Sequence, residues 1–288
     1  MEQRSIVAVQ KSMRHKRFIK KWVLAIIIYA VAIFYFFPIL YMFLSGFKTE
    51  QQAVMPSIFF KPTLETYKKV LSDPTMYQYL RNSLIQVIGG TGISLLLGVP
   101  AAFTIVFGRL KNKGSNDKYY VWFITTILLP PVAVLIPLFT WYQKLNLINT
   151  PYGLMAAYIG FHTPIIVWMV HSFFSDLPNE IFEAASLDGC TKLQQLYKIA
   201  IPMARTGIIS AALLVAVFIW NEFFLGFNLT GNPTATLPVF MSRFREQQGQ
   251  FVAQLSASST IAVLPAIILG WMTQKALVKG LTSGAVKG

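Results

Sequence analysis

Few side chains in this sequence are placed to do covalent or metal chemistry. His162 and His171 lie nine residues apart, so they do not share one face of a helix, and Cys190 is the only cysteine. A single cysteine excludes an intramolecular disulfide and gives no metal-ligand pattern. The sequence contains no H-E-x-x-H, G-x-S-x-G or G-x-x-x-x-G-K-[ST] pattern, so zinc proteolysis, serine hydrolysis and nucleotide binding all lack their residues. We therefore expect no catalytic residue, no metal site and no cofactor bound by this chain.

One hydrophilic segment, residues 175–205, differs from the others because it is acidic as well as basic. Its charged residues are Asp176, Glu180, Glu183 and Asp188 against Lys192, Lys198 and Arg205. Pro178 near a helix start and Glu180 in the first turn predict a helix that begins near Asp176 and runs to Gly189. A second helix is expected from Thr191, with Leu193, Leu196, Tyr197 and Ala200 on one buried face, until Pro202 restricts it. The segment thus predicts two short helices joined by a glycine turn.

A second candidate site is the run Trp220-Asn221-Glu222, which lies inside a long apolar stretch. A carboxylate in such a stretch is costly to place and is by default a functional-site hypothesis. These residues could face a cavity that a substrate crosses. Alternatively, Asn221 and Glu222 hydrogen-bond a neighbouring helix or reach the outer interface, and only hold the packing. The sequence leaves both interpretations open.

The elements that must position these residues follow from composition. The chain of 288 residues is 55% hydrophobic and 12% charged, whereas a soluble domain carries about 25% charged residues. An apolar stretch of about 20 residues is long enough to cross a bilayer as a helix. Six such stretches are present: Trp22–Leu44, Asn82–Phe107, Tyr119–Tyr142, Pro151–Phe174, Thr206–Leu229 and Phe251–Thr273. Because backbone groups in lipid must be satisfied within their own segment, we expect an all-α membrane protein with six transmembrane helices.

The distribution of Lys and Arg predicts the orientation of the chain. The N-terminal arm, the second-to-third and fourth-to-fifth loops and the C-terminal tail hold 17 of the 25 basic residues. Short basic loops are retained in the cytoplasm, so both termini and the segment 175–205 are expected there. Most of the net charge of +14 is then a topological signal. We expect the basic arm to contact lipid headgroups rather than nucleic acid.

The helix-turn-helix segment resembles a known family motif. The run Glu183-Ala184-Ala185-Ser186-Leu187-Asp188-Gly189, followed after nine residues by Ile199-Ala200-Ile201-Pro202, is similar to the EAA loop of ABC importer permeases. It departs from that pattern only at Ile201, where Leu is usual, and this change should not alter burial. In the family the loop docks as a coupling helix into a cleft on the ATP-hydrolysing subunit. The alternative is an amphipathic loop that merely lies on the bilayer.

The resemblance implies roles for individual residues of this loop. The ATPase-coupling residues would be Glu183, Ala184, Ala185, Asp188, Gly189, Ile199 and Pro202. The two alanines would keep one face small enough for close insertion, and Glu183 and Asp188 would offer charged contacts to the partner. Gly189 would permit the sharp turn between the helices.

The end of the chain carries a second resemblance. Residues 274–288 are similar to the C-terminal tail of the second permease of maltose-type importers, where the tail enters the interface between the two ATPases. The resemblance implies that Lys279, Gly280, Gly284 and Lys287 contact the ATPases. Without it, a tail rich in Gly and Lys would be expected to fray in solvent. The expected organisation is a basic cytoplasmic arm (1–21), a six-helix transmembrane domain (22–274) with its coupling loop at 176–202, and a cytoplasmic tail (275–288).

Together these resemblances imply the permease subunit of an ATP-driven, binding-protein-dependent importer of the carbohydrate type in a bacterial cytoplasmic (inner) membrane. Its expected partners are a homologous second permease, two cytoplasmic ABC ATPases that bind ATP and Mg²⁺, an extracytoplasmic solute-binding protein and membrane lipid. Arg243 and Arg245 in the external loop 230–250 are the candidate contact with the binding protein, unless that loop only connects two spans.

Other functions stay open at this point. A permease of an ABC importer for another solute class fits the same loop motif. A secondary transporter driven by an ion gradient would need intramembrane acids or histidines coupled to substrate, for which Glu222 alone is thin support. The external loops carry a mild positive excess, which would suit an acidic saccharide as well as a neutral one.

Overall fold

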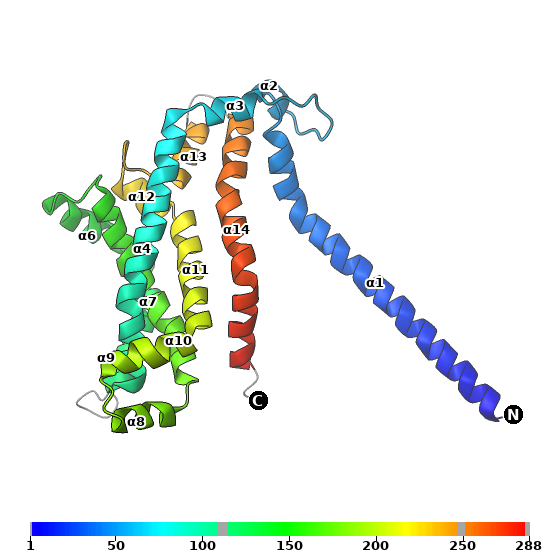
Figure 1. The fold of residues 1–288 in the computed structure, drawn as a ribbon. Coiled ribbons are helices and arrows are strands. Elements are labelled where there is room, and N and C mark those ends of the chain that lie inside the picture. The colour runs from blue at the N-terminus through cyan, green and yellow to red at the C-terminus, as the bar shows by residue number, and fades with distance from the viewer. Residues whose placement is uncertain (1, 109–114, 247–250, 286–288) are drawn as a thin grey trace. The chain divides into compact units, whose positions relative to one another are not determined.

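The computed structural model describes the backbone of residues 2–108, 115–246 and 251–285, and the regular elements in these ranges are all helical, as expected (Figure 1). Side chains are described for residue 18 and residues 20–108, 117–244 and 251–271. The chain divides into two compact units, Met1–Val70 with Phe251–Thr260, and Leu71–Gln250 with Ile261–Gly288. The two predicted site segments, residues 176–202 and 220–222, both lie in the second unit.

The first unit contains α1 (Glu2–Ser45), α2 (Glu50–Ala53), α3 (Glu65–Leu71) up to Val70, and the first residues of α14 (Val252–Ala285). The Glu50 carboxylate accepts hydrogen bonds from the backbone N–H groups of Ala253 at 3.0 Å and Gln254 at 2.9 Å. These donors belong to the first turn of α14, where backbone N–H groups have no partner within the helix. The carboxylate therefore caps the last helix from a position about 200 residues earlier in the sequence.

The first unit also holds a fully buried lysine. The Lys48 ammonium donates to the Ser57 carbonyl at 2.6 Å and lies over the rings of Tyr41 and Phe60, 4.8 and 5.1 Å from their centroids. The Thr66 hydroxyl donates to the Lys48 carbonyl at 2.7 Å. A buried cation needs such partners, and they fix the chain that follows α1 as an ordered segment.

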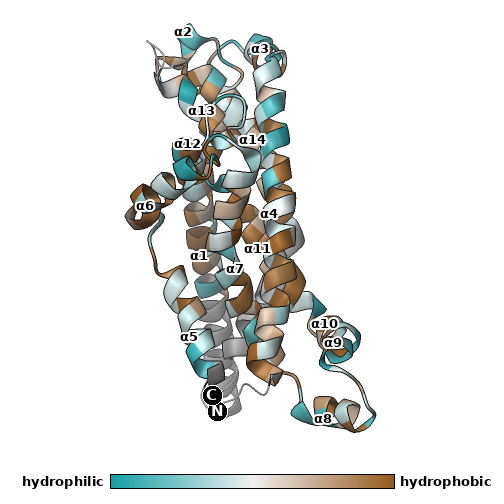
Figure 2. Cartoon of the chain, turned by 90° about the vertical axis from the view of Figure 1, so that its left-hand side faces the viewer, coloured by the Kyte–Doolittle hydropathy of each residue, from teal (hydrophilic) through white to brown (hydrophobic). Residues whose placement is uncertain are grey.

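The core of the second unit is built where α4 (Pro74–Phe107) packs along α7 (Pro151–Ser175), with α11 (Arg205–Asn221) and α5 (Ser115–Ile127) against them. Figure 2 shows α4 polar near Pro74 and apolar toward Phe107. At Gly98 a Cβ atom would lie only 2.6 Å from the Ile166 side chain of α7, so a glycine there allows the two helices to approach closely. Tyr158, Ile166 and Phe174 of α7 are fully buried in this core.

Four helices are long and apolar enough to cross a membrane by themselves, at Lys20–Ser45, Pro74–Phe107, Pro151–Ser175 and Val252–Trp271. The number rises to six if two bent helix pairs, Asp117–Ile127 with Pro131–Lys144 and Lys192–Met203 with Arg205–Asn221, each count as one span. The expectation of six apolar segments is compatible with this finding, but the expectation that each is one continuous helix is wrong for the third and the fifth.

The third expected span is broken between α5 and α6 (Pro131–Lys144), whose axes differ by 93°. The break coincides with Leu129-Pro130-Pro131. Proline lacks an N–H group and restricts the residue before it away from helical geometry, which explains the interruption. The fifth expected span ends as α11 at Asn221 and resumes as α12 (Phe224–Leu229).

The loop after α12 is tied to the first turns of α4. The side-chain amides of Gln78 and Asn82 both donate to the Pro233 carbonyl at 2.8 Å, and the Leu237 backbone N–H donates to the Ser83 hydroxyl at 2.8 Å. A helix then follows, α13 (Leu237–Glu246), and its buried Phe240 packs on the Tyr79 ring at 5.3 Å. The polar start of α4 thus orders this connection at the end of the unit opposite to the segment 176–202 (Figure 1).

Candidate functional site

The segment predicted to couple to a partner lies at the C-terminal ends of α4 and α7 (Figure 1). It consists of α8 (Asn179–Leu187), α9 (Lys192–Gln195), a π-helical turn η1 (Leu196–Ala200) and α10 (Ile201–Met203). The buried ring of Phe182 in α8 stacks on Phe107 at the end of α4, with centroids 3.9 Å apart. Phe174 at the end of α7 lies 6.2 Å from the same Phe107 ring. This aromatic cluster fixes α8 to the helical core.

The glycine turn has the geometry expected from the sequence. Gly189 adopts a φ of +80°, a conformation that other residues reach only with strain. The Cys190 N–H donates to the Ala185 carbonyl at 2.9 Å, which satisfies a carbonyl at the helix end. The helix before this turn, α8, is shorter than predicted, because Asp176 terminates α7 and Pro178 is the N-cap of α8.

A clamp that sequence reasoning missed holds the two short helices together. The Gln195 side chain is fully buried and its amide donates to the Ser186 hydroxyl at 2.7 Å and the Phe182 carbonyl at 3.2 Å. Its oxygen accepts from the Lys192 ammonium at 3.0 Å. Thr191 and Gln194 also form a capping box at the start of α9. The capping box was visible as Thr-x-x-Gln, whereas nothing in the sequence marks Gln195 as buried.

Burial divides the coupling residues into two groups. Glu183, Ala184, Asp188, Gly189 and Pro202 are exposed, while Ile199 is half-buried. Ala185 is buried inside this chain, so of the two alanines of the motif Ala184 is the exposed one. Ala185 lies one turn after Phe182, on the face that α8 turns toward its own chain.

The expected buried face of the second helix is also only half right. Leu196 and Ala200 are buried, but Leu193 and Tyr197 are 64% and 57% exposed. The π-helical turn from Leu196 to Ala200 widens the helical spacing, so Leu193 before it and Tyr197 within it do not fall on the face that a 3.6-residue period predicts. Leu187, at the end of α8, is 89% exposed. The segment therefore presents an apolar set to its surroundings, and large exposed apolar groups of this kind mark interaction surfaces.

The second predicted site lies where α11 ends. The Glu222 carboxylate accepts three hydrogen bonds, from the Tyr158 hydroxyl at 2.9 Å and from the backbone N–H groups of Leu225 at 2.8 Å and Gly226 at 3.1 Å. It therefore caps α12 and links that helix to α7. This geometry favours the packing role for Glu222.

The two neighbours of Glu222 have different surroundings. The Trp220 indole is buried and donates to the Ala262 carbonyl of α14 at 3.0 Å. Asn221 is exposed and donates to the Val217 carbonyl of its own helix at 2.8 Å. The structure therefore does not bring the three residues into one cavity, and Asn221 is the one that faces outward.

The two histidines occupy separate packing positions. His162 is buried, with Nδ1 2.7 Å from the Tyr158 carbonyl. The His171 ring stacks on Tyr120 of α5, with centroids 3.8 Å apart.

Comparison with known proteins identifies the family. Residues 94–282 match the family described as "Binding-protein-dependent transport system inner membrane component". The chain belongs to this family. It is 32% identical over 263 residues to the sulfoquinovosyl glycerol transport system permease protein SmoH of Agrobacterium fabrum, which covers 88% of this chain and 89% of that protein. It is also 32% identical to the trehalose/maltose transport system permease protein MalG of Thermococcus litoralis, over 90% of this chain and 94% of the relative.

Solved structures support the same fold for this transport-system component. A chain of a bacterial ABC transporter involved in the import of the acidic polysaccharide alginate superposes with a TM-score of 0.74 at 22% identity, covering 89% of this chain and 96% of that one. A chain of the MetNI methionine ABC transporter superposes with a TM-score of 0.57 at 16% identity, covering 73% and 99%. The resemblance drawn from the EAA-like loop is therefore confirmed at the level of the family.

The other predicted contact residues of this transport component are placed less completely. The Arg243 guanidinium lies over the Tyr79 ring, 4.8 Å from its centroid, so part of its surface is used inside the chain. The side chains of Arg245 and Lys279 lie outside the described side chains, Gly284 is described by its backbone alone, and Lys287 lies outside the described residues altogether. The backbone of residues 275–285, expected as a tail, continues α14 as helix, including Gly280.

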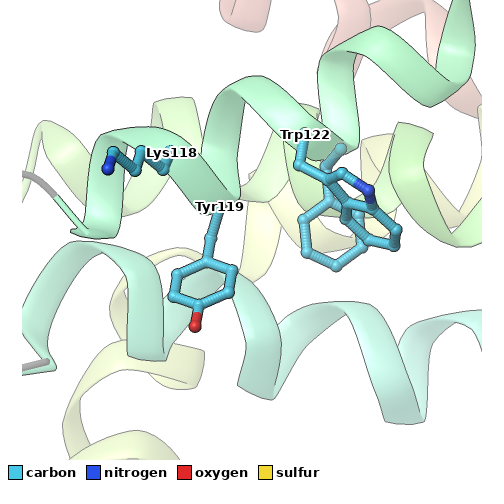
Figure 3. A pocket seen from close by; sticks show the side chains of 4 residues that line it. Lys118, Tyr119 and Trp122 are labelled. Atoms are coloured by element: carbon cyan, nitrogen blue, oxygen red, sulfur yellow. The ribbon is translucent and has the colours of Figure 1, made fainter.

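The hollows on the described surface of the second unit include two that lie beside its helices. One of about 450 Å³ lies between the ends of α4 and α8, with Phe107, Phe182, Glu183 and Lys192 among its walls. The other, of about 530 Å³, lies beside α5, and Figure 3 shows Tyr119 and Trp122 on the same side of that helix. Exposed aromatic residues at the start of a membrane helix are typical of the lipid interface.

Proposed function

We propose that this chain is the permease subunit of an ATP-driven, binding-protein-dependent carbohydrate importer, in which residues 176–202 couple the transmembrane helices to a cytoplasmic ATPase. The observation that carries the proposal is the short helix α8, fixed to the core by Phe182 and Gln195, with exposed Glu183 and Leu187 presented beside a positive-φ glycine. Because α8 is fixed to the core through Phe182 and exposes Leu187 at its C-terminal end, it is suited to transmit the movement of a bound partner to the transmembrane helices.

The proposed chemistry is divided between subunits. Two ABC ATPases would bind and hydrolyse ATP with Mg²⁺, and a homologous second permease would complete the pathway. This chain would add no catalytic group. ATP-driven closure of the ATPases would move α8 and favour the outward-open state, and this population shift needs only a few kcal/mol of differential contact.

The proposed topology places both termini and α8 in the cytoplasm of a bacterial cell with the chain in the inner membrane. Its support is the excess of Lys and Arg on that side. The loop that contains α13 then faces the solute-binding protein, with Arg243 and Arg245 as the proposed contacts. Residues 1–21 form the basic arm, residues 22–274 the transmembrane domain, and residues 275–288 contact the ATPases.

A sugar or oligosaccharide is the proposed substrate class. Its support is that relatives at 32% identity carry the names of transport systems for sulfoquinovosyl glycerol and for trehalose and maltose. These names span anionic and neutral glycosides, so both kinds belong in the substrate screen. Calorimetric titration of the cognate solute-binding protein with neutral and acidic oligosaccharides tests the class, and an exclusive preference for amino acids or peptides would refute it.

The coupling role is tested by placing a charge on the apolar tip of α8. Leu187→Glu is expected to abolish co-purification of the ATPases while the permease stays in the membrane, because an exposed side chain contributes little to the fold. Leu64→Glu is the matched control, since Leu64 is also an exposed leucine (59%) but lies on the proposed outer side. Equal ATPase recovery with both variants would refute docking through α8.

A further inference from the structure

We infer that the break between α11 and α12 forms a subsite for a neutral sugar ring on the translocation path, with Asn221 as its polar group and Phe218, Phe223 and Phe227 as its apolar walls. The inference rests on the proposed carbohydrate function and adds to it a ligand contact in this subunit.

Glu222 changes the hydrogen bonding of the backbone at the break. In a continuous α-helix the Leu225 N–H would donate to the Asn221 carbonyl four residues earlier. Here that N–H and the N–H of Gly226 both donate to the Glu222 carboxylate. The carboxylate takes the place of the helix carbonyls, so the Asn221 carbonyl has no such partner within the described residues. A polar backbone group is thus left open within an apolar segment.

The Asn221 side chain offers a second polar group at the break. Its amide nitrogen donates once, to the Val217 carbonyl, and among the described residues its side-chain oxygen has no hydrogen-bond partner. The side chain is exposed. Unsatisfied polar groups are costly against hydrocarbon, so this face of the break is suited to water or a polar ligand and poorly suited to lipid.

Three phenylalanines close to Asn221 in the sequence are partly exposed. Phe218, one turn earlier, is 44% exposed, and its ring lies 6.4 Å from that of His162. Phe223 and Phe227 are 40% and 46% exposed, with ring centroids 5.2 Å apart. Hydroxyl groups of a sugar can bond to an amide and a carbonyl, while its C–H faces cover aromatic rings, the combination typical of small-molecule sites.

The charge of the site selects among sugars. None of the three aromatic residues carries a positive charge, and neither does Asn221. The residue next to Asn221 is Glu222, which carries a carboxyl group. A carboxylate or sulfonate on the ligand would find no counter-charge from these residues. The subsite therefore takes the neutral part of a transported saccharide.

Uptake by the assembled importer, reconstituted in proteoliposomes with its solute-binding protein, is the first test, with labelled maltose and trehalose as probes in a panel of neutral and acidic oligosaccharides. Asn221→Ala is expected to lower uptake at limiting sugar by about three- to tenfold, the effect of one or two hydrogen bonds, and Asn221→Gln should recover part of it. Asn228→Ala is the matched control, because Asn228 makes the same bond to the carbonyl four residues earlier, at 2.7 Å.

The two hypotheses fail in different ways. If the wild-type importer takes up no saccharide of the panel, the proposed function is wrong and the subsite with it. If the wild type transports sugar and Asn221→Ala matches Asn228→Ala, the function stands and the subsite is refuted.

Cysteine labelling separates the possible occupants of the break. In a Cys190→Ser background, Asn221→Cys should react with a hydrophilic, membrane-impermeant thiol reagent, and the transported sugar should slow the reaction several-fold. Reaction only with lipid-soluble reagents would assign this face to lipid. Protection by the second permease alone, or reaction unaffected by sugar, would assign it to a subunit interface or to water, and each of these results overturns the subsite.

Discussion

Replacement of Glu222 tests how the break in the fifth apolar segment is held. Its two oxygens receive three donors, with Leu225 N–H on Oε1 and both Gly226 N–H and the Tyr158 hydroxyl on Oε2. Glu222→Gln offers one oxygen and one NH₂ group, so at least one backbone N–H then faces another donor. Glu222→Leu removes all three acceptor contacts.

The expected magnitudes follow from these counts. An unsatisfied buried donor costs about 1–3 kcal/mol, so Glu222→Gln should destabilise the subunit by about that amount. Glu222→Leu should cost roughly 3 kcal/mol or more, a large share of the 5–15 kcal/mol typical of a folded protein. Tyr158→Phe removes one donor, and its effect should be non-additive with that of Glu222→Gln by about 0.5–3 kcal/mol, because the two side chains are in contact.

Thermal denaturation of the detergent-purified complex, together with its yield, is the assay. One kcal/mol corresponds to about 2–4 °C for a chain of this size. The expected order of melting temperatures is wild type, then Glu222→Gln, then Glu222→Leu. Glu65→Gln, at an exposed glutamate of α3, is the control and should match the wild type. If Glu222→Leu melts with the control, the carboxylate does not hold α12, and the reasoning from these three contacts is wrong.

Three further predictions concern the coupling segment and the end of the chain. Gly189→Val should lower binding-protein-stimulated ATP hydrolysis while the subunit stays in the membrane, because φ is +80° there and a β-branched residue is strained at that angle. Gly189→Asn should lower hydrolysis less. Normal hydrolysis in the Val variant would argue against a coupling role for the turn. Gln195→Ala should speed amide hydrogen exchange in α8 about tenfold or more, since it removes two donated bonds and one accepted bond from a buried site, whereas Gln194→Ala, at an exposed residue of the capping box, should change it less. Removal of residues 280–288 should reduce recovery of the ATPases with the permease, and full recovery with an unchanged hydrolysis rate would leave that end without a contact role.

Features that depend only on residues close together in the sequence were predictable. Composition and the lengths of apolar runs were enough for an all-α membrane protein, because a helix that crosses lipid needs only a long apolar stretch that satisfies its own backbone. The Glu183 to Pro202 motif was enough for the family, since its spacing over 20 residues is specific. The glycine turn was predictable because Gly189 is the one residue there that takes positive φ without strain.

Features that depend on partners distant in sequence needed the structure. Apolarity does not distinguish a straight span from a broken one, so the breaks after Ile127 and Asn221 were missed. The sequence does not distinguish a buried glutamine from a solvated one. The role of Gln195 became identifiable only from the structure, in which the Phe182 carbonyl and the Ser186 hydroxyl accept its hydrogen bonds.

The run Trp220-Asn221-Glu222 shows the same division. The sequence determined that polar groups interrupt an apolar segment, and it left cavity and packing as alternatives. Tertiary structure separated the three residues, because the partners of Trp220 and Glu222 are Ala262 and Tyr158, 42 and 64 positions away. Contacts at such separations depend on how the helices pack, and that packing left Asn221 exposed.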